Sequence, residues 1–101
     1  MQDREIYVSV DIESDGPIPG PFSMLSVGLR AFSPFVPEGA PIEVASYEAN
    51  LARLPGASQD PATMAWWAEH LEAYERTRQN QRDPLDVAVE IVEWASMLPG
   101  I

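Results

Sequence analysis

The sequence predicts an α+β fold in which three β-strands precede two or three α-helices. Its first half holds three runs rich in β-branched and aromatic residues, which are typical of strands. In its second half apolar residues recur every three or four positions, which is the period of a helix. The same order of elements would also begin an α/β arrangement. A chain of 101 residues has the length of one domain.

The three expected strands cover about residues 5–13, 22–32 and 42–50. Proline fixes φ and lacks an amide donor, so the prolines between these runs mark their ends. The connections are short enough for an antiparallel meander, and their prolines predict broad turns in place of two-residue hairpins. Gly28, inside the second run, marks either a bulge or a close approach of another group to the backbone.

Two helical segments are expected at about residues 61–78 and 84–98. Each begins with an Asp-Pro pair, which places a capping residue directly before a proline at the first helical position. Glu72 and Arg76 lie one turn apart in the first segment and form a favourable surface pair. The second segment is so apolar that it needs cover on two sides.

The charge balance restricts the classes of partner. Asp and Glu number 16 against six basic residues, all of them arginine, so the formal net charge is −10. Proteins that bind nucleic acid or anionic membranes through charge attraction alone carry a basic surface instead. The absence of cysteine excludes disulfides and thiolate metal sites. No apolar run is long enough to span a bilayer, and the polar N-terminus is unlike a secretory signal, so we expect a cytoplasmic protein.

Two carboxylates stand together at the end of the first strand. Asp11 and Glu13 are two positions apart, which on a strand places them on one face, about 6.6 Å apart. Adjacent ionised carboxylates repel each other, and a bound Mg²⁺ or Mn²⁺ would remove that repulsion. The simpler alternative is that the strand emerges into water at this point. A calcium loop is excluded, because proline and phenylalanine occupy its later ligand positions.

The stretch YVSVDIESDGPIPGPFSMLSVGLRAF, residues 7–32, resembles the start of a 3′–5′ exonuclease of the DEDD superfamily. This superfamily includes ribonuclease T, oligoribonucleases and polymerase proofreading domains, and its first motif is an Asp-x-Glu at the end of the first strand. Asp11 and Glu13 fill that motif. The later stretch LPGASQDPATMAWWAEHLEAYE is similar to the region where a Thr and a Trp precede a helix packed on the sheet.

The resemblance implies a ribonuclease H-like fold and hydrolysis of phosphodiester bonds at single-stranded 3′ ends of DNA or RNA. It implies that Asp11 and Glu13 are catalytic and hold two Mg²⁺ or Mn²⁺ ions, whose charge would let an acidic protein attract phosphate. It also implies that Ser14, Asp15 and Gly16 lie against the terminal nucleotide.

The resemblance covers only the N-terminal part of such an enzyme. The second and third acidic motifs of the superfamily follow a fourth strand, and we find no match to them before Ile101. We therefore expect the chain to be inactive alone, and to be a fragment or to pair its exposed strand edge with another copy. Two further interpretations remain open: a non-catalytic acidic interaction protein, and an inactive exonuclease-like assembly domain.

Three aromatic and apolar side chains, Trp66, Phe22 and Met24, have two interpretations each. Trp67 fits the apolar stripe of the first helical segment, which predicts a core position, whereas Trp66 lies off that stripe. Trp66 either stacks on a base or packs beneath the loop at residues 55–61. Phe22 and Met24 either form an apolar pocket for a base near the carboxylates or pack in the core.

Overall fold

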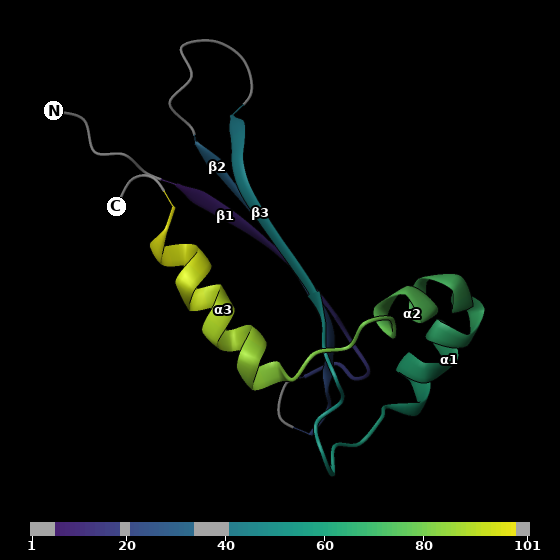
Figure 1. Ribbon diagram of the computed structural model, residues 1–101. Helices are drawn as coiled ribbons and strands as arrows, with labels where there is room; N and C mark the ends of the chain where they lie inside the picture. Colours follow the sequence, from purple (N-terminus) through teal and green to yellow (C-terminus); the bar gives the residue numbers. More distant parts are fainter. Residues whose placement is uncertain (1–5, 19–20, 34–40, 99–101) are drawn as a thin grey trace, which may run out of the picture.

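The computed structural model describes residues 6–18, 21–33 and 41–98. Three strands form one antiparallel sheet in the order β1-β2-β3, and helices follow them, so the α+β expectation is confirmed (Figure 1). Glu5, expected in the first strand, and most of the broad turn expected before Pro41 lie outside the described residues. The strands are β1 (Tyr7–Ser14), β2 (Met24–Ser33) and β3 (Ile42–Asn50).

The second half of the chain forms α1 (Pro61–Glu69), α2 (Leu71–Thr77) and α3 (Pro84–Ser96). The segment expected as one helix over residues 61–78 is interrupted at His70, whose φ of −129° and ψ of 49° are not helical. No helix in the described ranges is long and apolar enough to cross a membrane.

Both expected N-terminal caps are present. The Asp60 carboxylate accepts a hydrogen bond from the Thr63 amide at 2.9 Å, and Asp83 accepts one from the Leu85 amide at 2.8 Å. Each cap satisfies an amide that the first turn of its helix leaves without an intrahelical partner.

The two faces of the sheet differ in character. Val10 of β1 lies opposite Leu29 of β2, and Leu29 lies opposite Tyr47 of β3, which gives an apolar face. On the other face the register aligns Asp11 with Gly28 and Gly28 with Glu48. Figure 1 shows α3 on one side of the sheet and α1 and α2 near the end where β1 and β3 finish.

The core lies between α3 and the apolar face of β2 and β3. Val27, Leu29, Leu51 and Val87 are buried there, with Tyr47, Ala49, Ile91 and Trp94 packed around them. Burial of each large apolar side chain contributes roughly 1.5–3 kcal/mol. Only one side of α3 is covered by the described residues.

Hydrogen bonds to backbone carbonyls attach the α1–α2 unit to the end of the sheet. The Trp67 indole N–H donates to the Ser14 carbonyl at 2.9 Å. The Arg78 guanidinium donates to the carbonyls of Leu25 at 2.8 Å and Leu51 at 2.9 Å. These contacts fix α1 and α2 beside the last residues of β1.

Candidate metal and nucleic-acid site

Asp11 and Glu13 lie side by side on the polar face of β1, as the two-residue spacing predicts. Asp11 is exposed and Glu13 is half-buried. Their neighbours on β2 are Gly28 and Ser26, which are too small to cover them. Within the described part of the chain, neither carboxylate makes a hydrogen bond or an ion pair. Both are therefore available to a ligand.

The electrostatics of the pair are unfavourable in the absence of a cation. The pKa of Glu13 is raised above its ordinary value, first because the carboxyl is partly buried and second because Asp11 is close. A nearby cation would have the opposite effect, since it favours the charged form. A divalent cation beside the pair would therefore favour the ionised form of Glu13.

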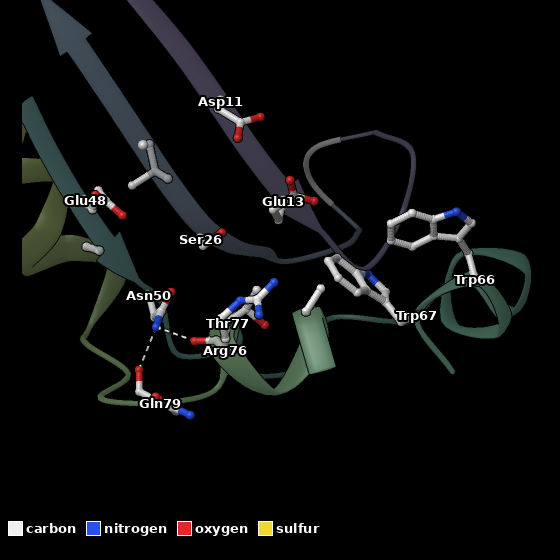
Figure 2. A pocket seen from close by; sticks show the side chains of 14 residues that line it. Asp11, Glu13, Ser26, Glu48, Asn50, Trp66, Trp67, Arg76, Thr77 and Gln79 are labelled. Carbon is white, nitrogen blue, oxygen red and sulfur yellow. Dashed lines mark hydrogen bonds between the residues drawn. The ribbon is translucent and has the colours of Figure 1, made fainter. Parts of the chain in front are cut away.

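A pocket of about 500 Å³ opens between these carboxylates and the α1–α2 unit (Figure 2). It is lined by residues from β1, β2, β3, α1 and α2, so it depends on how the α1–α2 unit attaches to the sheet. Its charged and aromatic lining residues are Asp11, Glu13, Glu48, Trp66, Trp67 and Arg76. No local sequence pattern indicates that Glu48 or Arg76 belongs here, because their placement depends on strand register and on how α2 attaches to the sheet.

Gly28 forms the floor of this pocket between Asp11 and Glu48. The irregularities in the sheet lie between Glu13 and Ser14 and between Ala31 and Phe32, so Gly28 is not at a bulge. A Cβ atom at Gly28 would approach only the Asp11 carbonyl oxygen, at 4.0 Å, among the described residues. The described fold would therefore accept a side chain here, and its absence leaves open space beside the carboxylates.

The Asp15 side chain lies inside the loop after β1 and does not line the pocket, so contact of this residue with a nucleotide stays a prediction. The side chain is completely buried, and its two oxygens accept hydrogen bonds from the Ser23 amide at 2.7 Å and from Arg53 Nε at 3.1 Å. Gly16 is also buried, and a Cβ atom there would overlap the Phe22 ring. The contacts of Asp15 and Gly16 therefore stabilise the conformation of the loop that follows β1.

Ser14 is likewise occupied within its own loop. Its hydroxyl donates to the Gly16 carbonyl at 2.8 Å, and its own carbonyl accepts from Trp67. It is absent from the pocket lining. Ser14 therefore fixes the end of β1 next to Glu13, and contact with a nucleotide at Ser14 stays a prediction.

Met24 also lies away from the carboxylate pocket, and its contact with a substrate stays a prediction. The register shifts by one residue between Glu13 and Ser14, which reverses the alternation of side chains beyond that point. Met24 consequently lines an apolar hollow with Leu51 and Val87, on the α3 side of the sheet and away from the carboxylates. Phe22 packs against Gly16, so these two residues do not form an apolar pocket at the site.

The two tryptophans separate as the helix period predicts. Trp67 is buried at 4% exposure, and its core position is confirmed. Trp66 is 50% exposed, lines the pocket, and stacks on the His70 ring with a centroid distance of 4.0 Å and an interplanar angle of 18°. His70 is itself exposed at the end of α1. The stacking of the two rings limits the motion of the Trp66 ring and leaves about half of the side chain accessible.

The ligand set is incomplete within the described residues. They contain no group of three or more His, Cys, Asp or Glu side chains that could hold a metal ion. Mg²⁺ keeps several waters and is commonly bound through one or two carboxylates together with substrate phosphates. Asp11 and Glu13 fit that partial role, because their oxygens are free and share one face.

The comparisons with known proteins associate the chain with a nuclease. It is similar to the 3′–5′ DNA exonuclease Cap18 of Escherichia coli, with 38% identity over 95 residues. The match covers 91% of this chain and 43% of Cap18, so the chain spans less than half the length of that relative. No protein-family profile and no solved structure matches the chain.

Proposed function

We propose that the chain forms the first part of a metal-dependent 3′–5′ exonuclease domain that hydrolyses phosphodiester bonds at single-stranded 3′ ends. The observation that carries the proposal is that Asp11 and Glu13, which have no hydrogen-bond or ion-pair partner among the described residues, face an open pocket at the end of β1. The similarity to Cap18 over most of the chain supports the same activity and favours DNA as the substrate. A ribonuclease H-like fold of the DEDD type is part of this proposal.

Each of four residues has its own role in this proposal. Asp11 and Glu13 hold Mg²⁺ or Mn²⁺, and Trp66 offers its exposed ring to a base, a contact worth roughly 1–3 kcal/mol. Gly28 leaves space for a nucleotide beside the carboxylates. A cation bound there supplies a Lewis acid for the phosphate and a more acidic water. Further carboxylates complete the site in the whole enzyme, as in the superfamily that the sequence resembles.

A thermal titration with Mn²⁺ tests the metal site. Because a ligand that binds only the folded state stabilises it, Mn²⁺ at about 100 times its Kd should add roughly 2.7 kcal/mol to the free energy of unfolding. We expect the Tm of the wild-type chain to rise with Mn²⁺, and the Asp11→Asn and Glu13→Gln variants to lose most of that rise.

The matched control is Asp86→Asn, which removes an exposed carboxylate from the first turn of α3. This variant should keep the wild-type response. Without metal, Asp11→Asn should be at least as stable as wild type, because it removes a repulsive neighbour of Glu13. Equal Mn²⁺ shifts in wild type and Asp11→Asn would refute the metal site and leave an acidic interaction protein as the better account.

A further inference from the structure

The arginines of the described chain divide into two groups. Arg53 pairs with the buried Asp15, Arg78 donates to two backbone carbonyls, and Arg82 pairs with Glu90 through both of its terminal nitrogens. These three guanidinium groups make hydrogen bonds that stabilise the fold. The side chains of Arg30 and Arg76 are instead 66% and 67% exposed.

Arg76 is the one cationic side chain among the described residues that line the pocket. Figure 2 shows it on the far side of the pocket from Asp11, below Ser26 and Glu13 in that view. Its ion pair is with Glu72, one turn earlier on α2, at 3.4 Å. The Glu72 side chain is 91% exposed, and ion pairs between exposed side chains contribute little to stability. A phosphate group can therefore replace Glu72 as the partner of Arg76.

The backbone of Arg76 is held in place by the sheet. The Asn50 side-chain amide, at the end of β3, donates to the carbonyls of Arg76 and Gln79, each at 2.8 Å (Figure 2). These bonds satisfy one carbonyl in the last turn of α2 and one in the segment that follows the helix. Asn50 thereby fixes where the Arg76 side chain begins relative to Asp11 and Glu13.

Resting on the proposed function, we propose that Arg76 binds a backbone phosphate of the substrate strand. The strand then crosses the pocket, with its scissile phosphate at Asp11 and Glu13 and another phosphate at Arg76. Arginine suits this role because its planar guanidinium donates two parallel hydrogen bonds to one phosphate. Its position also gives the strand a favourable contact on the side of the pocket opposite the carboxylates.

Binding of a fluorescein-labelled single-stranded DNA oligonucleotide, followed by anisotropy in Mn²⁺, tests this assignment. We expect Arg76→Gln to weaken binding about five- to tenfold and to reduce the salt dependence of log K by about 0.7, the value of one phosphate contact on a single strand. Arg76→Lys should recover part of the affinity, because it restores the charge without the fork.

Two controls separate this contact from other effects. Arg30→Gln makes the same charge change at a similarly exposed arginine. Arg30 is absent from this pocket but lines a neighbouring hollow with Asp11 and Glu48, so we expect Arg30→Gln to weaken binding less than Arg76→Gln does. Glu72→Gln removes the ion-pair partner and should leave binding equal or tighter. Arg76→Gln should also keep the full Mn²⁺-induced rise in Tm.

The outcomes distinguish the two proposals. If wild type binds the strand and Arg76→Gln matches Arg30→Gln in both affinity and salt dependence, the assignment of Arg76 is wrong while the nuclease proposal stands. If wild type does not bind the strand in Mn²⁺, the proposed function fails, and the role of Arg76 fails with it.

Discussion

Asp11, Glu13 and Asp15 lie within five residues of one another, yet they have different roles. Asp11 and Glu13 obey the alternation of side chains in β1 and face the pocket, with no hydrogen-bond or ion-pair partner among the described residues. Asp15 comes after the shift in register and is fully buried. The sequence predicted the first two correctly as neighbours on one face, because only local strand geometry is needed. The burial of Asp15 depends on Ser23 and Arg53, which are distant in sequence, so the local pattern could not show it.

Replacement of Asp15 tests that structural role. Asp15→Asn places an amide N–H₂ or a weaker acceptor against either the Ser23 amide or Arg53, so it should lower the free energy of unfolding by about 2 kcal/mol. Urea denaturation measures the change. Asp11→Asn is the matched control at a carboxylate without partners, and it should lose no stability. Equal stabilities of the two variants would contradict the assignment.

At the scale of elements, patterns along the chain predicted which segments are helices and strands better than how they meet. The caps at Asp60 and Asp83 and the burial of Trp67 are local properties and are confirmed. The interruption at His70 carries no proline or glycine signal, so periodicity alone predicted a continuous helix. The contact of α2 with the end of β3 arises from long-range hydrogen bonds of Asn50, which no local pattern encodes.

Gly28 provides the prediction for the sheet. A glycine inside a strand costs about 0.5–1 kcal/mol relative to alanine, and the described neighbours leave room for a methyl group. Gly28→Ala should therefore keep or slightly raise the free energy of unfolding. It should also weaken binding of a single-stranded oligonucleotide severalfold, because the methyl group enters the pocket between Asp11 and Glu48.

Urea denaturation and fluorescence anisotropy on the same Gly28→Ala sample measure both properties. Unchanged affinity would show that the open floor of the pocket is not used by the strand. A clear loss of stability would instead show that the fold itself requires glycine at this position.

At the scale of the whole molecule, a large apolar surface is exposed. Val10 and Ile12 of β1, on the α3 side of the sheet, are 58% and 46% exposed, and Leu85 and Val92 of α3 are 72% and 69% exposed. β1 is also an outer strand of the described sheet. The sequence predicted a helix needing cover on two sides, and the described residues cover one. Exposed apolar patches and free strand edges favour association.

We therefore predict that the chain associates with itself through β1 and α3 when it is isolated. Sedimentation velocity over a wide range of concentrations should show a rising average mass, and Ile12→Ser should weaken the association by reducing the apolar area. A wild-type chain that stays monomeric throughout that range would contradict this prediction.

We expect a divalent cation to bind at Asp11 and Glu13, and the position of bound Mn²⁺ on the chain decides whether it does. Mn²⁺ broadens the NMR signals of nearby nuclei, so ¹H–¹⁵N spectra recorded with substoichiometric Mn²⁺ locate the ion on the chain. If the ion binds there, the amides around Asp11, Glu13 and Gly28 lose intensity first, while those of α3 around Asp86 keep theirs. Broadening centred elsewhere, or spread evenly over the acidic residues, would contradict this expectation.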